Sequence, residues 1–259
     1  MKLEDPKISQ AIVETYHKKL MDIIYSDCVI VGGGPSGLVA AKILADAGYK
    51  VVVLERNLFC GGGMWGGGMM FNQVVIQDSA LKILDREGVR YEHFADSMYT
   101  ADSVECICAL AVNAIQAGAK IMNNISFEDT IIKNDKMEGL VINWTCVSRD
   151  HMMVDPIMIE SKAVLDATGH EAMVCNKLVA KMGNVLKTPS GGMEGEKPMN
   201  ADQGEQQVVD NTQEAYPGLF VCGMAANAAF GGQRMGPVFG GMLLSGEKVA
   251  KQIMEKIGK

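Results

Sequence analysis

The segment CVIVGGGPSGLVAAKILADAGYKVVVLER, at residues 28–56, constrains the fold of this chain more than any other part of the sequence. It reads as a buried strand, a glycine-rich turn, a helix, a second buried strand and an acidic residue. Gly32, Gly34 and Gly37 form G-x-G-x-x-G directly after the first strand, and Glu55 closes the second strand 18 residues beyond Gly37. This is the dinucleotide-binding fingerprint in its full context. We therefore predict an α/β protein with a Rossmann-like parallel sheet that binds an adenine dinucleotide.

Each residue of the fingerprint has its own physical task. Gly32 permits the tight turn, Gly34 lets the backbone approach the pyrophosphate, and Gly37 lets the helix pack closely on the strand. The free N–H groups at the start of the helix then face the phosphates. Glu55 is expected to accept hydrogen bonds from the hydroxyls of the adenosine ribose.

Composition indicates an ordinary globular protein with small-molecule ligands. The chain has 259 residues, of which 48% are hydrophobic, enough for one large α/β domain. The net charge is −7 and no Lys/Arg-rich run is present, which argues against nucleic-acid or membrane-surface binding. The sequence has no apolar stretch of membrane-spanning length and no targeting signal, which predicts a cytoplasmic protein. The seven cysteines form no C-x-x-C pair and are typical of free, largely buried thiols in a reducing compartment.

We predict a single domain over residues 1–259. Apolar spacing at 8–24 indicates an amphipathic helix lying against the sheet, and further helices are predicted at 76–88 and 103–118. AKIMNN begins another strand. FEDTIIK, EGLVINWTCV, VDPIMIES and KAVLDATG then predict a β-meander inserted over about 125–160. The polar, Gly-rich segment 184–214 predicts a long mobile loop before a strand at 219–224 and a long final helix.

A second glycine-rich stretch, NLFCGGGMWGGGMMF, follows the second strand of the fingerprint. Its glycine density indicates backbone that wraps closely around a ligand. A flexible surface loop is the alternative, which Met64 and Trp65 disfavour because such side chains are seldom left on one.

Two later features are similar to the flavoproteins that contain two dinucleotide-binding folds. One is the strand ending in Ala167-Thr168-Gly169, and the other is LFVCGM, a strand before a Gly-rich turn into a helix. In that group the late strand normally ends in Gly-Asp, whose carboxylate holds the flavin dinucleotide. Here the pair is Gly223-Met224, which argues against tightly held FAD.

Several more specific segments together resemble the Thi4 family, the adenosine-diphosphate thiazole synthases of thiamine biosynthesis. They are AIVETY…SDCVIVGGGPSGL, LERN…GGGMWGGGMMF, GLVINWT, VDP followed by TGH, and FVCGM…RMGPVFGGMLLSG, which span nearly the whole chain. The resemblance implies that NAD is consumed as a substrate. Nicotinamide leaves, the ADP-ribose opens to a ketose, glycine condenses with it, and sulfur addition and ring closure give an ADP-thiazole carboxylate.

The resemblance also assigns residues to the NAD and glycine sites. Arg234, in GGQRMGP, matches the residue that holds the glycine carboxylate, a role that suits a guanidinium because it pairs bidentately with carboxylates. The alternative for a lone arginine is a surface ion pair, which the surrounding glycines and proline disfavour. The residues expected to contact or line the NAD site, besides the three fingerprint glycines, are Ser36, Glu55, Arg56, Gly63, Phe127, Met153, Val154 and Met224.

Asp155 and His170 match the residues that bind iron in the family, with the aspartate supplied by a neighbouring subunit. A carboxylate and an imidazole with open positions suit Fe(II). Taken alone, the pair would indicate a turn cap before Pro156 and a structural histidine. The family usually forms octamers, so the resemblance implies a homo-oligomer with shared active sites.

Met153 occupies the position that decides the source of sulfur. Eukaryotic members carry there a cysteine that surrenders its own sulfur in a single turnover, and archaeal members commonly carry histidine. A thioether cannot readily give up sulfur by the same β-elimination. We therefore predict a true catalyst of the archaeal and bacterial type that uses free sulfide with Fe(II). His151 is a candidate acid/base group for the proton transfers, or else a solvated loop histidine.

Three other functions stay open at this point. A flavin- or NAD-dependent oxidoreductase, such as a geranylgeranyl-reductase-like enzyme, keeps the fingerprint but leaves Asp155, His170 and Arg234 without a role. A ribose-1,5-bisphosphate isomerase or related sugar-phosphate enzyme shares the sugar ring-opening chemistry. A non-enzymatic NAD sensor is the third.

Overall fold

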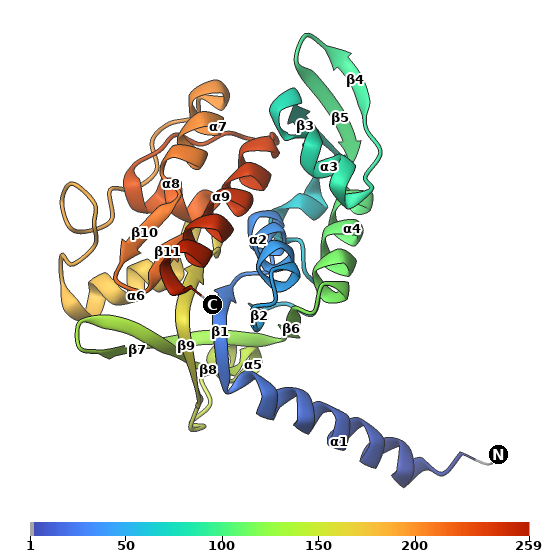
Figure 1. Ribbon diagram of the computed structural model, residues 1–259, viewed down its shortest axis with the longest axis vertical. Helices are drawn as coiled ribbons and strands as arrows, with labels where there is room; N and C mark the ends of the chain where they lie inside the picture. Colours follow the sequence, from blue (N-terminus) through green and yellow to red (C-terminus); the bar gives the residue numbers. More distant parts are fainter. Residues whose placement is uncertain (1–2, 259) are drawn as a thin grey trace.

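The computed structural model describes residues 3–258, so the two ends of the predicted domain lie outside the described residues. An 8-stranded, mainly parallel sheet forms the centre of the molecule (Figure 1), as the sequence predicted. The path β10-β11-β9-β1-β2-β6 runs across it, and the hairpin β7-β8 joins it through β9. The strands are β1 (Tyr25–Val31), β2 (Val51–Glu55), β6 (Lys120–Asn123), β7 (Ile125–Lys133), β8 (Lys136–Trp144), β9 (Ile157–Asp166), β10 (Gln213–Tyr216) and β11 (Leu219–Val221).

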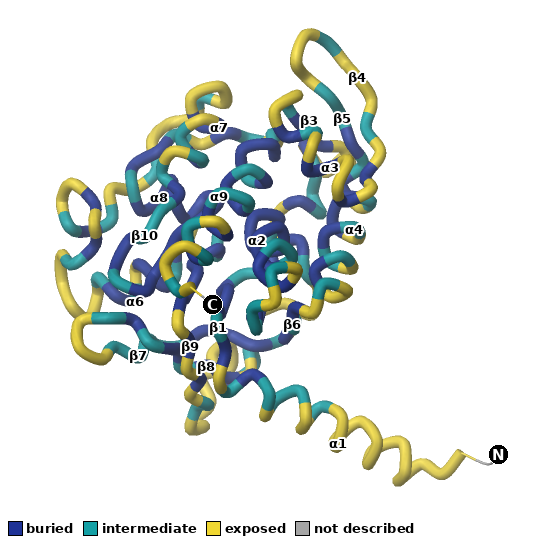
Figure 2. Tube along the Cα trace, viewed as in Figure 1, coloured by how far each residue is buried: buried dark blue, intermediate teal, exposed yellow. Residues whose placement is uncertain are grey.

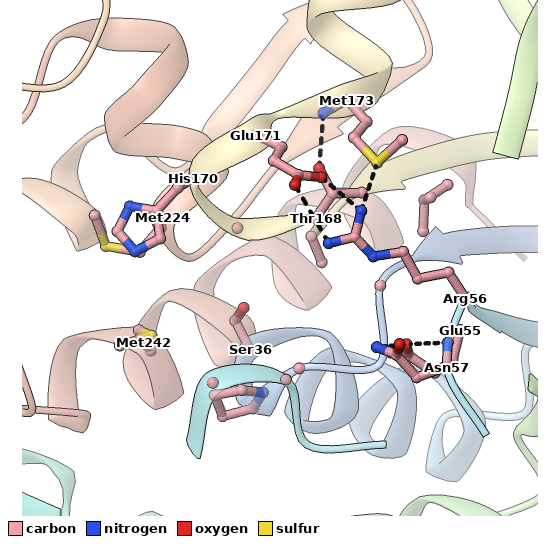
Figure 3. Close-up of a pocket in the computed structure, with 18 of the residues that line it drawn as sticks. Ser36, Glu55, Arg56, Asn57, Thr168, His170, Glu171, Met173, Met224 and Met242 are labelled. Carbon is pink, nitrogen blue, oxygen red and sulfur yellow. Dashed lines mark hydrogen bonds and ion pairs between the residues drawn. The ribbon is translucent and has the colours of Figure 1, made fainter. Parts of the chain in front are cut away.

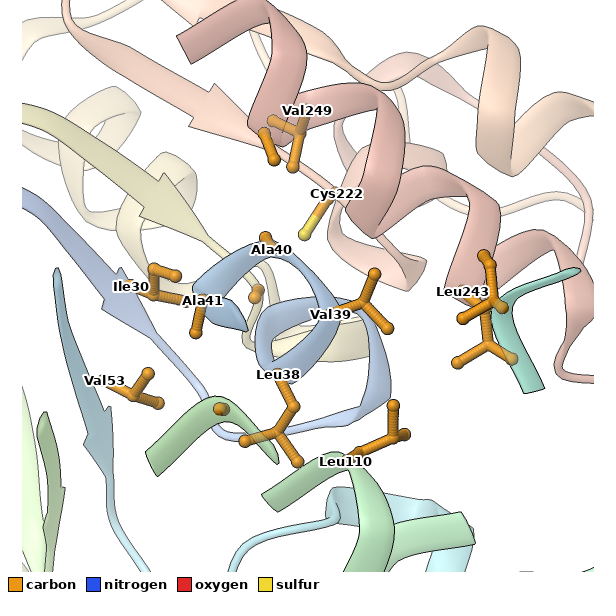
Figure 4. Close-up of a cluster of buried hydrophobic side chains, with 14 of the residues drawn as sticks. Ile30, Leu38, Val39, Ala40, Ala41, Val53, Leu110, Cys222, Leu243 and Val249 are labelled. Carbon is orange, nitrogen blue, oxygen red and sulfur yellow. The ribbon is translucent and has the colours of Figure 1, made fainter. Parts of the chain in front are cut away.

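Helices cover both faces of the sheet, so the inner strands are apolar on both sides. Cys28 and Ile30 of β1 face one core, which they share with α2 (Pro35–Asp46), α4 (Ser103–Gln116) and α9 (Gly240–Ile257). Figure 4 shows α2 at the centre of this core, with side chains from β1, β2, α4 and α9 around it. Val29 and Val31 face the opposite core, which contains α6 (Met173–Met182) and α8 (Met224–Phe230).

The predicted meander is partly wrong in its strand limits. The runs VDPIMIES and KAVLDATG form one strand, β9, instead of two. The two polar residues where the runs meet are accommodated within the strand: Ser161 donates a hydrogen bond to the carbonyl of Ala163 (2.6 Å), and Lys162 pairs with Asp27 (2.8 Å). The run EGLVINWTCV stops at Trp144, where the short helix α5 (Thr145–Arg149) begins.

The first helix does not lie against the sheet as predicted. Helix α1 (Asp5–Ile23) projects away from the rest of the chain (Figures 1 and 2). Its apolar residues Ile12 and Val13 are 63% and 66% exposed, and only Ile23 at its end is buried. The apolar periodicity correctly predicted a helix. Only its C-terminal part packs on the rest of the chain, where Tyr16 and Leu20 lie against the core that contains α6 and α8.

A small antiparallel sheet, in the order β3-β5-β4, was missed. Its strands are β3 (Gln73–Gln77), β4 (Glu92–Ala95) and β5 (Met98–Asp102), and the 3₁₀ turn η2 (Asp78–Ala80) and helix α3 (Leu81–Glu87) fill the rest of the predicted 76–88 helix. The alternation of QVVIQ, with Val74 and Ile76 buried, is the signal for the first strand. The predicted helix at 103–118 is α4, which begins where the Asp102 carboxylate accepts hydrogen bonds from the amides of Val104 (2.8 Å) and Glu105 (2.9 Å).

Residues 184–214 are not the single long loop that their polarity predicted. They contain helix α7 (Ala201–Asp210) and the start of β10. Gly204 lets α7 approach the 233–235 backbone closely, because a Cβ there would lie 2.8 Å from the carbonyl oxygen of Gln233. The helix was not predicted because polar residues and glycine dominate its sequence. Close packing at Gly204 stabilises it instead.

All seven cysteines are free thiols within the described chain. Cys28, Cys106, Cys175 and Cys222 are buried, while Cys108 is exposed. Among the helices of residues 3–258, none is long and apolar enough to span a membrane.

Candidate functional site

A pocket of about 800 Å³ lies at the carboxyl ends of β1, β2 and β9. Ligands of open α/β sheets bind at this edge, and the volume is within the range of small-molecule sites. Segments distant in sequence meet here: the fingerprint turn, the 62–69 loop, the 167–173 turn and the 234–242 segment. The predicted site residues that line the pocket are Gly32, Gly34, Ser36, Glu55, Arg56, Gly63, Phe127, His170, Met224 and Arg234.

Packing requires two of the fingerprint glycines, and the third faces the pocket. Gly32 has φ +104, and a Cβ there would overlap the carbonyl oxygen of Ala167. A Cβ on Gly37, which does not line the pocket, would overlap the carbonyl oxygen of Gly32, so this glycine permits the contact between helix and strand. A Cβ on Gly34 would meet no atom of the described chain within 4 Å. Gly34 therefore has no packing requirement, and it lines the pocket where a ligand phosphate is predicted.

Glu55 is buried, with 4% of its surface exposed, at the end of β2. One carboxylate oxygen accepts a hydrogen bond from the Gly33 amide (3.0 Å), and the other accepts two from Asn57, at its backbone amide (2.8 Å) and side-chain amide (3.0 Å). These bonds fix the carboxylate beside the glycine turn. Because each oxygen has more than one lone pair, acceptor capacity is left for a ribose hydroxyl.

The second glycine-rich stretch is built around one buried side chain. Met64 is fully buried within the 3₁₀ turn η1 (Gly62–Gly66), and the Trp65 indole donates a hydrogen bond to the Cys60 carbonyl (2.5 Å). Gly62, Gly63, Gly67 and Met69 line the pocket. This segment therefore forms a wall of the pocket, which agrees with the prediction of backbone close to a ligand and not with a free surface loop.

The turn that carries His170 is held by Asp166, the buried last residue of β9. One carboxylate oxygen accepts hydrogen bonds from the amide (3.1 Å) and hydroxyl (2.7 Å) of Thr168. The other accepts them from the amides of Val174 (2.9 Å) and Cys175 (3.0 Å) in the first turn of α6. Burial raises the pKa of Asp166 above its ordinary value, and the four hydrogen bonds oppose that rise. Asp166 thus fixes both ends of the short turn between β9 and α6.

Arg56 and Glu171 point toward one another across the pocket (Figure 3). The Arg56 guanidinium donates to both carboxylate oxygens of Glu171, at 2.7 Å and 3.3 Å, and both side chains are about half exposed. Sequence reasoning identified Arg56 but missed Glu171, because the two residues lie far apart in the chain.

Arg234 and His170 are connected by Glu196, which was also missed. The His170 Nδ1 lies 2.6 Å from one carboxylate oxygen of Glu196, and the Arg234 Nε lies 3.8 Å from the other. The two predicted functional side chains are about half exposed, whereas that of Glu196 is 17% exposed. Glu196 lies in the segment read as a mobile loop, where the sequence carries no signal for a site residue.

The remaining predicted site residues lie in an exposed loop between α5 and β9. His151, Met153, Val154 and Asp155 are all exposed, Met153 completely, and none of them lines the pocket of its own chain. Within residues 3–258, no three His, Cys, Asp or Glu side chains gather in a group that could hold a metal ion. One chain therefore brings His170 and Arg234 together and leaves Asp155 outside.

Comparison with known proteins identifies relatives over the full length of the chain. The model of the Thi4 family matches residues 9–239. Thiamine thiazole synthase from Methanothermobacter thermautotrophicus is 50% identical over 99% of this chain and 100% of its own length, and that from Pyrococcus furiosus is 48% identical over 99% of each. The crystal structure of Thermovibrio ammonificans THI4 matches with a TM-score of 0.98 and 48% identity, covering 100% of both chains.

Proposed function

Because the chain belongs to the Thi4 family, whose similar members are thiamine thiazole synthases, we propose that it makes ADP-5-ethyl-4-methylthiazole-2-carboxylate from NAD, glycine and free sulfide. The main support for this proposal is that residues with three different predicted roles line one pocket. The dinucleotide turn, His170 and Arg234 all line it, although they lie far apart in sequence.

The ADP half of NAD is assigned to the fingerprint side of the pocket. The amides at the start of α2 bind the pyrophosphate next to Gly34, and Glu55 accepts the ribose hydroxyls. Arg234 binds the glycine carboxylate and so orients the amine toward the opened sugar. The dinucleotide is consumed in this proposal, which is consistent with the absence of a carboxylate at Met224.

The described residues fit Fe(II) only when two chains contribute. One chain offers the His170 imidazole at the pocket, and the exposed Asp155 carboxylate is outside its own pocket. A second copy that placed its Asp155 at this pocket would complete an imidazole–carboxylate pair. Bound iron would supply a Lewis acid for sulfide delivery. We therefore propose a homo-oligomer with shared sites, an octamer by analogy with the family.

Free sulfide is proposed as the sulfur source because neither Met153 nor Cys60 is a suitable donor. Met153 is a thioether. Cys60, the cysteine beside the fingerprint turn, is half-buried, and burial together with the charge of Glu55 raises the pKa of its thiol to about 11. A thiol with that pKa carries little thiolate at neutral pH and is a poor nucleophile.

The first test is a count of product molecules per chain. Anaerobic incubation with NAD, glycine, sulfide and Fe(II) is expected to yield more than one ADP-thiazole carboxylate per chain, measured by liquid chromatography and mass spectrometry. Omitting sulfide should abolish the product. The protein mass should be unchanged, and loss of ~34 Da from a cysteine, the order expected for conversion to dehydroalanine, would instead show that the protein donates its sulfur.

The shared site predicts complementation between two inactive variants. Asp155→Ala and His170→Ala should each be inactive alone. Coexpressed in equal amounts, they should recover about a quarter of the wild-type activity, because one pocket in four pairs an intact His170 with an intact Asp155 from its neighbour. Coexpressed Asp155→Ala and Arg234→Ala should show the same recovery. Activity that stays at the level of the single variants would place Asp155 outside the neighbour's pocket.

A further inference from the structure

The carboxylate of Glu196 lies between the two side chains to which the proposed function assigns metal and glycine binding. Its contact with His170 Nδ1, at 2.6 Å, is short, as expected for a hydrogen bond to a charged acceptor. The other oxygen, 3.8 Å from Arg234 Nε, is within ion-pair range. One acidic side chain thus restrains both groups.

The backbone around Glu196 is fixed by the segment that precedes and contains Arg234. The amides of Glu194 and Gly195 donate to the carbonyls of Ala229 and Ala228, each at 3.0 Å. The amide of Lys197 donates to the carbonyl of Gly232 (2.9 Å), and an isolated bridge pairs Lys197 with Gln233. The backbone on both sides of Glu196 is therefore held to the 228–234 segment, which fixes the place from which its side chain extends.

Asn227 stabilises the 228–234 segment through buried hydrogen bonds. Its side chain is fully buried in the middle of α8, where its amide donates to the Gln233 carbonyl (3.0 Å) and its oxygen accepts from the side-chain amide of Asn211 (2.9 Å). The turn before Arg234 is thus anchored to the body of the protein, and the position of Glu196 relative to His170 is defined by the fold.

A carboxylate facing one ring nitrogen determines the tautomer of a neutral histidine. An ionised carboxylate only accepts hydrogen bonds, so the proton of the ring must lie on the nitrogen that faces it. In His170 that nitrogen is Nδ1, which leaves Nε2 with a free lone pair. Such a contact orients metal-binding histidines and raises their basicity. The adjacent carboxylate of Glu171 is engaged by Arg56 instead.

We infer that Glu196 is a positioning residue that holds His170 as the Nδ1–H tautomer, with Nε2 available to a divalent cation, and limits the movement of Arg234. The inference deepens the proposed function and rests on it for the identity of the cation. The tautomer itself is a property of the metal-free protein and can be measured without any turnover.

The test is solid-state ¹⁵N NMR of histidine-labelled, metal-free protein at pH ~9, where ordinary histidines are neutral. The chain has four histidines, and a His170→Asn variant assigns the signal. His93 is an internal reference of the opposite kind, because its Nε2 faces the Asp96 carbonyl (3.0 Å) and must carry the proton. His170 is expected as Nδ1–H in the wild type. A predominantly Nε2–H form there would overturn the inference.

Two variants of Glu196 and one matched control complete the design. Glu196→Ala should shift His170 toward the Nε2–H form, and Glu196→Gln, whose amide can face either tautomer, should give a mixture. Glu194→Gln is the control, because Glu194 lies on the same segment and its carboxylate accepts from the Ser190 amide (2.8 Å), away from His170. An unchanged His170 tautomer in both Glu196 variants would contradict the assignment.

Anaerobic titration with Fe(II) separates this inference from the proposed function. Glu196→Ala is expected to bind Fe(II) about 10- to 100-fold more weakly than the wild type, and Glu194→Gln should bind it equally well. A wild type that binds no Fe(II) while His170 is Nδ1–H would count against the iron chemistry only. Equal Fe(II) affinity in the wild type and Glu196→Ala would overturn the positioning role.

Discussion

Replacing Gly34 with valine is expected to weaken NAD binding by roughly 100-fold or more, equivalent to about 3 kcal/mol, without unfolding the protein. Gly34 is the N-cap of α2, with φ −76 and ψ 177, a conformation that any residue adopts. A Cβ there would meet no other described atom within 4 Å, so the branch point of the new side chain has room in the free protein. It would instead occupy the space next to the amides that are predicted to bind the pyrophosphate.

Isothermal titration with NAD, together with thermal unfolding of the free protein, checks this result. Gly66→Val is the matched control, because a Cβ on Gly66 also meets no atom within 4 Å and Gly66 does not line the pocket. The control should bind NAD normally. Gly37→Val should behave oppositely to Gly34→Val and destabilise the fold itself, since its side chain would collide with the Gly32 carbonyl. Normal NAD affinity in Gly34→Val would refute the assignment of the pyrophosphate to this turn.

Replacing Asp166 with alanine is expected to reduce the free energy of unfolding by about 3–5 kcal/mol. The substitution removes the acceptor for three amides and one hydroxyl in a place without solvent access. Two of those amides belong to the first turn of α6, which then lacks an acceptor for the amides of Val174 and Cys175. A loss of this size should lower the thermal unfolding midpoint by roughly 10 °C.

Asp46→Ala is the control for Asp166→Ala, because it makes the same chemical change at an exposed pair with Lys42 on α2. Its unfolding midpoint should shift by no more than ~2 °C, since surface ion pairs contribute about 0–1 kcal/mol. Asp166→Asn should be intermediate, because an amide keeps one acceptor oxygen and turns an NH₂ group toward the remaining donors. Equal stability of Asp166→Ala and Asp46→Ala would show that water or rearranged backbone satisfies the freed amides.

Local sequence correctly predicts the parts of the fold where the local pattern and the packing of the core favour the same structure. The strand–turn–helix–strand unit of the fingerprint was predicted correctly. Its strands are apolar on both faces, and at Gly32 and Gly37 only glycine fits the close backbone contacts. The errors occur where a distant contact overrides the local pattern. Strand β9 contains polar residues that are satisfied by Asp27 and by its own backbone, and α7 contains a glycine required by packing against residue 233.

The site residues likewise include some that the sequence identifies and some that only distant contacts reveal. Glu55, His170 and Arg234, identified by motif or resemblance, line the pocket. Met153, Val154 and Asp155, identified by the same resemblance, lie outside the pocket of their own chain. Glu171 and Glu196 could not be found from the sequence, because each acquires its place only through a side chain remote in the chain, Arg56 in one case and His170 with Arg234 in the other. An acidic residue in a polar segment is ordinarily solvated, and no local pattern distinguishes these two from the rest.

The pairing of β1 with β9 has a consequence for the order of events during synthesis. The turn at Gly32 is closed by the backbone of Ala167, and the Ala167 amide donates to the Val31 carbonyl (2.9 Å). A nascent chain that has emerged only as far as β2 therefore holds the whole fingerprint without the completed pocket. At the usual rate of translation the missing strand follows on the order of ten seconds later. During that interval the edge of β1 that later pairs with β9 has no partner and can pair with strands of other chains.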